Sequence, residues 1–270
     1  MRWINRRPGR AATVALALLP FVLVIALYAA ASEARRAVNP ADRLLPAPTQ
    51  LIETAGRLAT EPDRRSGRVL LWSDTAASLQ RLAAGVAIAA GIALAVGLAI
   101  GLLPLVQAGL GSFVAALSMV PPLAVLPILF IVFGLGEGAK VALIAIGITP
   151  FLIRDLAART AEIPREQLVK AQTLGASSLA IALHVALPQM LPRLIGAVRL
   201  ALGPAWLFLI AAEAIASDSG LGYRIFLVRR FFAMDVILVY VLWITLLAIL
   251  LDLALRLLAR RLARWAEASP

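Results

Sequence analysis

The chain has 270 residues, of which 61% are hydrophobic and 15% are charged. Soluble domains contain about 45–50% apolar residues, so this composition excludes an ordinary soluble protein and indicates a membrane protein. The absence of cysteine excludes disulfides, thiol catalysis and cysteine-based metal sites. The net charge of +11 is typical of basic residues that flank membrane spans. Nucleic acid is not expected as a partner, because no basic stripe contains interleaved aromatic residues.

Six stretches, taken in chain order, are candidates for membrane spans, since a spanning helix needs about 20 apolar residues. They are residues 11–31, 82–103, 109–134, 138–153, 195–216 and 236–258. The strands of a membrane barrel would instead alternate over only about 10 residues. The expected fold class is therefore all-α, a polytopic membrane helix bundle with about six transmembrane helices.

Basic residues at both ends of the chain set the expected topology. They are Arg2, Arg6, Arg7 and Arg10 at one end, and Arg256, Arg260, Arg261 and Arg264 at the other. Cytoplasmic placement of both ends requires an even number of spans and puts the 154–194 loop in the cytoplasm as well. The loop of residues 32–81 then lies outside, although it contains eight arginines against six acidic residues. Long loops follow the charge rule less strictly, so we keep the six-span topology.

The first span has features of a secretory signal peptide, because MRWINRRPGR precedes it and ALYAAAS ends it. Its apolar run is longer than the usual core of about 7–15 residues, so we expect a retained membrane anchor. After it, the sequence predicts a short amphipathic helix near residues 48–60 and a polar turn at 61–68.

The predicted cytoplasmic loop 154–194 has the composition of two short helices. Pro164 suits the first turn of a helix that runs over residues 165–173. Gly175 ends that helix, because glycine adopts backbone angles that other residues avoid. Residues 176–187 form the second helical piece, and Pro188 bends the chain into the fifth span.

The spacing in this loop resembles the cytoplasmic motif of ABC-importer permeases: Glu-Ala-Ala, three residues, Gly, nine residues, then Ile-x-Leu-Pro. Here Gly175 is followed by nine residues and then Val185-Ala186-Leu187-Pro188. The Glu-Ala-Ala positions read Val169-Lys170-Ala171, and the nearest acid is Glu166. The resemblance implies that this loop couples the chain to an ATPase. The implied coupling residues are Glu166, Lys170, Ala171, Gly175, Ala176, Val185, Leu187 and Pro188.

The resemblance continues in order over about residues 40–265. Residues 119–140, 196–206, 211–223 and 250–265 are similar to stretches of the nitrate/sulfonate/taurine-type branch. It implies a MetI-like type I importer fold in a bacterial inner membrane, which agrees with the cytoplasmic termini expected from the basic ends. The implied partners are two cytoplasmic ATP-binding subunits, a periplasmic or lipid-anchored solute-binding protein, a second copy of the chain and membrane lipids.

Under this interpretation the chain has three parts. Residues 1–35 are a cytoplasmic tail and the first transmembrane helix, and residues 36–81 are an extracytoplasmic loop with the amphipathic helix. Residues 82–270 are the permease core, which includes the coupling segment 160–190.

The chain itself is not expected to be an enzyme or to bind a cofactor. A phosphate-binding P-loop needs Gly-Lys-Ser/Thr, but the two lysines, Lys140 and Lys170, follow Ala139 and Val169. ATP would therefore be bound by the partner subunits. His184 is the only histidine, so neither a metal pair nor a Ser-His-Asp triad is expected, and we interpret it as a packing or interfacial residue.

Charged residues and prolines inside spans are candidates for a translocation pathway or gate, because both are costly in a membrane. Arg199, Trp206 and Glu213 recur every seven residues in the fifth span and so share one helix face. The alternatives are that Arg199 snorkels to the inner surface and that Glu213 is a structural hydrogen-bond acceptor. Pro121 and Pro122 predict a kink that lines the pathway or serves packing.

Two further pairs are assigned structural roles. Asp252 and Arg256 are spaced for a salt bridge on one helix, and Gly97 and Gly101 allow close helix approach.

Three functions remain in view at this point. The first is the permease subunit of an ATP-driven importer for a small anion, such as a sulfonate, nitrate or a taurine-like solute. The second is a stand-alone ion-coupled carrier or channel, and the third is a membrane scaffold that transports nothing.

Overall fold

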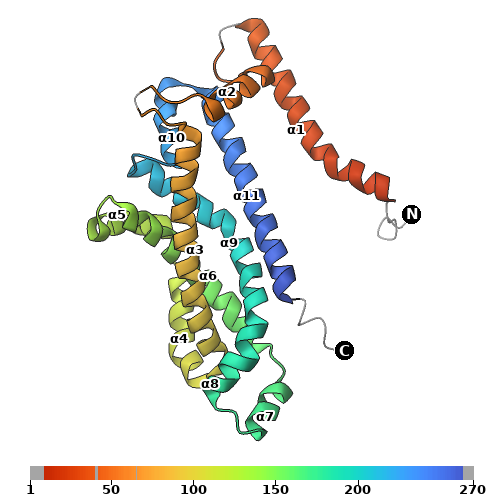
Figure 1. Cartoon of the computed structure of the whole chain (residues 1–270), viewed down its shortest axis with the longest axis vertical. Helices are drawn as coiled ribbons and strands as arrows, with labels where there is room; N and C mark the ends of the chain where they lie inside the picture. Colours follow the sequence, from red (N-terminus) through yellow and green to blue (C-terminus); the bar gives the residue numbers. More distant parts are fainter. Residues whose placement is uncertain (1–8, 40–41, 65, 264–270) are drawn as a thin grey trace. The chain divides into compact units, whose positions relative to one another are not determined.

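The computed structural model describes residues 9–39, 42–64 and 66–263, and these residues form only helices and loops (Figure 1). Arg2, Arg6, Arg7 and Arg264, on which the expected topology partly depends, lie outside the described residues. The chain forms two compact units. The N-terminal unit comprises Met1–Glu61 and Val228–Val239, and the core unit comprises Pro62–Leu227 and Tyr240–Pro270.

The N-terminal unit contains α1 (Arg10–Val38), α2 (Pro48–Thr60), the short 3₁₀-helix η3 (Arg229–Phe231) and the start of α11 (Met234–Ala263). α2 is the amphipathic helix expected near residues 48–60, so that prediction is confirmed. The Tyr28 hydroxyl donates to the Pro46 carbonyl at 2.7 Å, and the Thr54 hydroxyl donates to Asp235 at 2.8 Å. The first bond joins α1 to the loop that follows it, and the second joins α2 to the start of α11.

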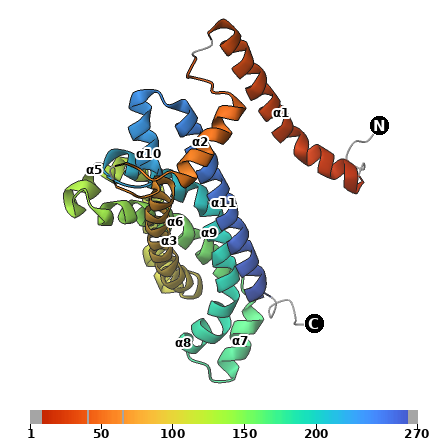
Figure 2. The ribbon, with the colours of Figure 1, turned by 45° about the horizontal axis from the view of Figure 1, so that its top comes forward.

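The core unit is a bundle of long helices joined by shorter ones (Figures 1 and 2). In chain order it contains α3 (Leu70–Leu102), α4 (Pro104–Leu117), α5 (Pro122–Phe133), α6 (Glu137–Ala161), α7 (Arg165–Thr173), α8 (Ser178–Ile181), the π-helix η2 (Ala182–Ala186), α9 (Leu187–Ile215), α10 (Leu221–Val228) and the rest of α11.

Small residues allow α3 and α6 to pack closely from Gly85 to Gly101 on α3. A Cβ at Gly97 would lie 3.0 Å from the Leu156 Cβ, and one at Gly101 would collide with Thr160. Gly97 and Gly101 therefore allow α3 to approach α6 closely, as the sequence predicted. α9 runs in the opposite direction, since Arg193 bonds the Arg159 carbonyl near the end of α6.

The described residues contain five helices that are long and apolar enough to cross a membrane, and a sixth candidate that is bent. The third predicted span, 109–134, was wrong as a single helix: α4 and α5 meet at 95° across residues 118–121. Pro121 and Pro122 cause this break, because proline lacks an N–H and disfavours helical geometry in the residue before it.

Several helices extend beyond the apolar runs that predicted them. α3 begins at Leu70 rather than 82, α6 continues to Ala161 rather than 153, and the fifth span follows directly from the helical piece that begins at Ser178. Polar side chains at a span's end do not break a helix, so hydropathy alone underestimates its length. Arg154 therefore lies on α6 and not in a loop, which corrects the predicted boundary.

Candidate functional site

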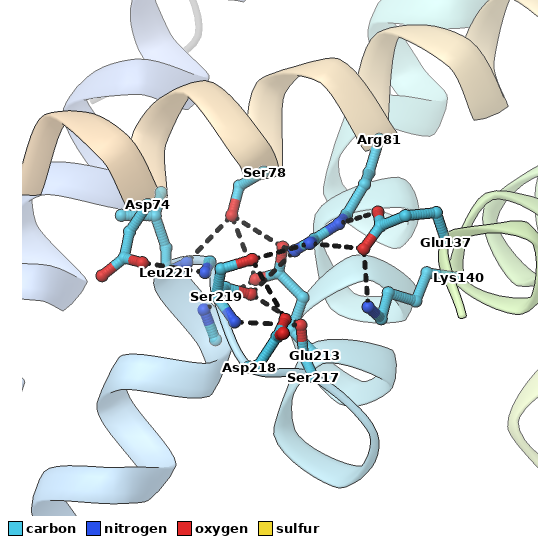
Figure 3. Close-up of polar contacts among 12 residues, drawn as sticks. Asp74, Ser78, Arg81, Glu137, Lys140, Glu213, Ser217, Asp218, Ser219 and Leu221 are labelled. Carbon is cyan, nitrogen blue, oxygen red and sulfur yellow. Dashed lines mark hydrogen bonds and ion pairs between the residues drawn. The ribbon is translucent and has the colours of Figure 1, made fainter. Parts of the chain in front are cut away.

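The core unit has distinct polar regions at its two ends. The segment α7–α8 lies at one end, and α10 lies at the other (Figures 1 and 2). At the α10 end a set of polar side chains, most of them buried or half-buried, meets from α3, α6, α9, α10 and the loop before α10 (Figure 3). We call it the charge cluster, and it consists of Asp74, Ser78, Arg81, Glu137, Lys140, Glu213, Ser219 and Arg224.

Arg81 is the centre of the charge cluster and is 5% exposed. Its Nε and Nη2 donate to the two oxygens of Glu137 at 2.5 and 2.8 Å, a bidentate pair. Its Nη1 donates to Glu213 at 2.7 Å and to the Ser219 carbonyl at 2.8 Å. Every nitrogen of the guanidinium is thus hydrogen bonded, and the Arg81 side chain joins α3, α6, α9 and the loop before α10.

Glu213 is completely buried at the end of α9. Besides Arg81, its carboxylate accepts from the Ser78 hydroxyl at 2.8 Å and from the backbone N–H of Gly222 at 2.8 Å. The N–H groups that open a helix have no partner within the helix and favour an anion. Glu213 therefore accepts hydrogen bonds from three partners and caps α10 from another helix, while its role as a gate element stays a prediction.

The rest of the α10 N-terminus is capped in the same way from α3. The Gly220 N–H donates to Asp74 at 2.9 Å, and the Leu221 N–H donates to the Ser78 hydroxyl at 2.9 Å. Arg224 in turn donates to Asp74 at 2.8 Å. Burial disfavours the Arg224 cation, but the hydrogen bond to Asp74, the charge of Asp74 and the nearby tyrosines together outweigh burial and raise the pKa of Arg224. Within the cluster, three carboxylates face three cations, so its charges compensate one another.

The turn before α10 depends on glycine. Gly220 has φ +114°, and a Cβ there would collide with the Glu213 carboxylate. A Cβ on Gly222 would lie 2.8 Å from the Ile210 carbonyl oxygen. Only glycine allows the backbone to approach the buried carboxylate this closely.

At the opposite end, the predicted coupling residues around Gly175 form a helix-ending motif. The Gly175 N–H donates to the Gln172 carbonyl at 2.9 Å, and the Ala176 N–H donates to the Ala171 carbonyl at 3.0 Å. Gly175 has φ +82°, in the left-handed region. These are the two characteristic hydrogen bonds of a Schellman motif. Gly175 therefore ends α7 and reverses the chain, as predicted.

The coupling segment presents both charged and apolar side chains to the surroundings. Glu166 and Lys170 are exposed on α7, while Leu174 is 80% exposed and Leu179 is 68% exposed.

The remaining predicted coupling residues lie where this segment joins α9. Val185, Leu187 and Pro188 are half-buried, and the Leu187 N–H donates to the Ala182 carbonyl in a π-helical turn. Gln189 of α9 bonds Gln167 of α7 at 3.2 Å, which holds the two helices together.

The predicted pathway residues do not form one site. Arg199 is paired with Asp252 of α11 at 2.8 and 3.0 Å, so it does not simply snorkel to a surface. Trp206 is buried and its Nε1 has no hydrogen-bond partner among the described residues. Pro121 is exposed at the α4–α5 break, and Pro122 lines a cavity beside it. Fourteen residues separate Arg199 from Glu213, about 21 Å along the helix.

Sequence reasoning did not identify Asp74, Ser78 or Arg81 as site residues. Their spacing contained a usable signal, because positions 74, 78 and 81 lie on one face of a helix. Within the described residues, no group of three or more metal-binding side chains could hold an ion.

These features define a class: a polytopic helical membrane subunit with a largely buried charge cluster at one end and an exposed short-helix segment at the other. The chain belongs to the family described as binding-protein-dependent transport system inner membrane component, whose model matches residues 83–265. It is therefore an ABC-transporter permease subunit and a multi-pass membrane protein.

The relatives come from one branch of this family. The chain is 34% identical to the taurine transport system permease protein TauC of Escherichia coli (strain K12) over 221 residues, which cover 82% of this chain and 80% of TauC. It is 36% identical to the putative aliphatic sulfonates transport permease protein SsuC of the same organism over 224 residues, covering 83% and 82%. It is 31% identical to the nitrate import permease protein NrtB of Synechococcus elongatus, covering 77% and 75%. The predicted nitrate/sulfonate/taurine-type branch is confirmed.

A solved structure supports the fold. A chain of the MetNI methionine ABC transporter, in an inward-facing crystal form, matches with a TM-score of 0.64 at 21% identity, covering 72% of this chain and 97% of that chain. The predicted MetI-like type I importer fold is therefore confirmed.

Proposed function

We propose that this permease forms the translocation pathway for a small anionic solute. A periplasmic binding protein delivers the solute, and ATP hydrolysis by two cytoplasmic partner subunits drives its transport across the membrane. The observation that carries the proposal is the segment α7–α8. It ends α7 with a Schellman turn, exposes Leu174 and Leu179, and is bonded through Gln189 to α9, a helix that crosses the bundle. A force on α7 would thus reach α9 directly.

The direction of the chain through the membrane follows from counting helices. With α1 as one span and the bent α4–α5 pair as another, the chain crosses six times. An even number puts both ends on one side, together with α7, and the basic ends assign that side to the cytoplasm. The charge cluster then lies at the extracytoplasmic end, and a second copy of the chain completes the pathway.

The solute class is inferred from the relatives, whose names refer to taurine, aliphatic sulfonates and nitrate. All three solutes carry an oxyanion group. The binding protein selects among them, so the chain's own contribution is a route compatible with a small oxyanion.

The test is co-expression of the chain with an ATPase subunit, using Leu174→Asp as the variant. A charge at this 80% exposed leucine should abolish co-purification of the ATPase, whereas Ile52→Asp, at a 74% exposed position on α2, should not. The purified chain alone should show no ATPase activity. Normal ATPase binding and ATP-driven uptake with Leu174→Asp would reject the coupling role. Solute uptake by the chain alone would instead support the ion-coupled carrier or channel.

A further inference from the structure

A cavity of about 640 Å³ lies in the core unit beside the break between α4 and α5. Its walls include Val125 of α5, Phe151 of α6 and Phe208 of α9. Cavities of about 300–1,000 Å³ with mostly apolar walls and few polar groups are typical of small-molecule sites. The residues of α6 that line it, 146–155, occupy the middle of Glu137–Ala161, so the cavity lies between the charge cluster and α7.

The charges beside this cavity do not balance. Arg154 and Asp155 both line it, but Asp155 already accepts from Arg159 at 2.8 Å. Among the described residues, Arg154 makes one side-chain hydrogen bond, to the Ser118 hydroxyl at 2.8 Å, and no ion pair. A guanidinium has five N–H donors, so most of those on Arg154 remain available to a ligand. The cavity therefore has one positive charge without a protein counter-ion.

The helix break adds a second feature that favours an anion. α5 begins at Pro122, so the positive end of this 12-residue helix lines the same cavity as Arg154. Transporters commonly build solute sites near the membrane midplane from interrupted helices, whose N-termini bind anionic groups.

We propose that this cavity is a transient site for a small oxyanion with a short apolar body, such as an aliphatic sulfonate. Arg154 and Ser118 bind the anionic head, while Val125, Phe151 and Phe208 contact the apolar part. The apolar walls favour an aliphatic sulfonate over nitrate, which has no apolar part to bury. This site rests on the proposed function, because it names one position on the route of the imported solute.

The natural absence of cysteine makes a direct test possible. Val125→Cys places a single thiol in the cavity wall, and Phe151→Cys places one on α6. Each variant is expressed as the full-length chain, and its membranes are reacted with the anionic thiol reagent sulfonatoethyl methanethiosulfonate or with the cationic reagent trimethylammonium-ethyl methanethiosulfonate. The ratio of the two reaction rates reports the local potential. Val169→Cys, at an exposed position on α7, gives the reference ratio outside the cavity.

We expect the anion-to-cation rate ratio at Val125→Cys to exceed the reference ratio. Adding Arg154→Gln to this variant should lower the ratio by about tenfold, because a unit charge several ångströms away is then missing from a partly dry site. Arg154→Lys should retain most of the ratio, and Arg256→Gln, which removes a charge from α11, should leave it unchanged. Ethanesulfonate should protect the thiol only when Arg154 is present, and nitrate should protect it less.

A ratio that Arg154→Gln leaves unchanged would overturn the proposal, as would protection by ethanesulfonate that does not depend on Arg154. Absence of labelling at both Val125→Cys and Phe151→Cys would also overturn it, because the cavity would then be closed to small anions. The assay needs neither ATP nor a partner. If the wild-type complex fails to import any anion while the rate ratio persists, the proposed function fails and the anion site stands.

Discussion

The guanidinium of Arg81 lies 2.7 Å from the carboxylate of Glu213, and the side chains are only 5% and 0% exposed. These residues lie 132 positions apart in the chain and connect α3 to the end of α9. The same guanidinium also holds Glu137 at the start of α6. One end of the bundle is therefore fixed by buried charges, whereas the polar contacts at the opposite end, such as Gln189 to Gln167 and Arg193 to Glu162, are largely exposed.

The first prediction concerns this buried pair. Glu213→Ala removes the acceptor for Arg81, Ser78 and the Gly222 N–H, and leaves a buried cation with one carboxylate fewer. Breaking a buried pair from one side costs about 3–5 kcal/mol, so thermal unfolding in detergent should begin at a clearly lower temperature. Glu162→Ala removes an exposed pair with Arg193 and should cost about 1 kcal/mol or less. Equal losses of stability in the two variants would contradict the structural role of the charge cluster.

Gly220 provides a second test of the charge cluster. Gly220→Ala adds a methyl group at φ +114° that collides with the Glu213 carboxylate, so the turn before α10 must move. We expect a loss of about 1–3 kcal/mol, seen as a lower unfolding temperature. Gly203→Ala is the control, because a Cβ there meets nothing within 4 Å. That variant should match the wild type or exceed it, and the reverse ranking would show that the turn is not constrained.

The sequence predicts the elements of this fold better than it predicts their junctions. Long apolar runs identify the spans, because lipid forces each run into a helix whatever its neighbours are. The bend at Pro121 was expected only as a kink, since its 95° size depends on what α5 packs against. Gly175 was predicted correctly, because helix termination is a local property of the chain.

The charge cluster could not be predicted in the same way. Glu213 was identified as costly inside a span, but its partners Ser78 and Arg81 come from a segment more than 130 residues earlier. In the structure Arg199 forms an ion pair with Asp252, whereas the sequence predicted only Arg256 as the partner of Asp252. Periodicity shows which residues share a helix face, whereas the choice of partner depends on how the helices pack.

A third prediction ranks the two arginines that contact Asp252. Arg199 makes two bonds to it, at 2.8 and 3.0 Å, and is 25% exposed, while Arg256 makes one at 3.2 Å and is 49% exposed. Arg199→Leu should therefore destabilise the permease more than Arg256→Leu, by up to about 1 kcal/mol. The unfolding temperature of each variant, and of Asp252→Asn, checks the order. A larger loss with Arg256→Leu would show that the helical i,i+4 pair dominates.

The fourth prediction uses the left-handed residue that ends α7. Gly175→Val forces a β-branched side chain to φ +82°, whereas Gly175→Asn places there a residue that tolerates this region. A Cβ at Gly175 meets nothing within 4 Å, so any effect comes from the backbone and not from a clash. Gly175→Val should reduce ATPase co-purification and uptake severalfold, and Gly175→Asn should retain most of both. If asparagine and valine were equally harmful, the Schellman turn would not be what the partner requires.

The last prediction joins helix packing to the cavity. Gly147 of α6 faces Phe208 of α9, and a Cβ on Gly147 would collide with the Phe208 ring, which itself lines the cavity. Gly147→Ala must therefore displace the ring or separate the helices, at a cost of about 1–3 kcal/mol. Gly91→Ala on α3 meets nothing within 4 Å and should stabilise its helix slightly. Displacement of the ring into the cavity should also slow labelling of Val125→Cys by both thiol reagents equally, since space rather than charge has changed. A change in the anion-to-cation ratio with Gly147→Ala would mean that the ring, and not Arg154 alone, sets the potential there.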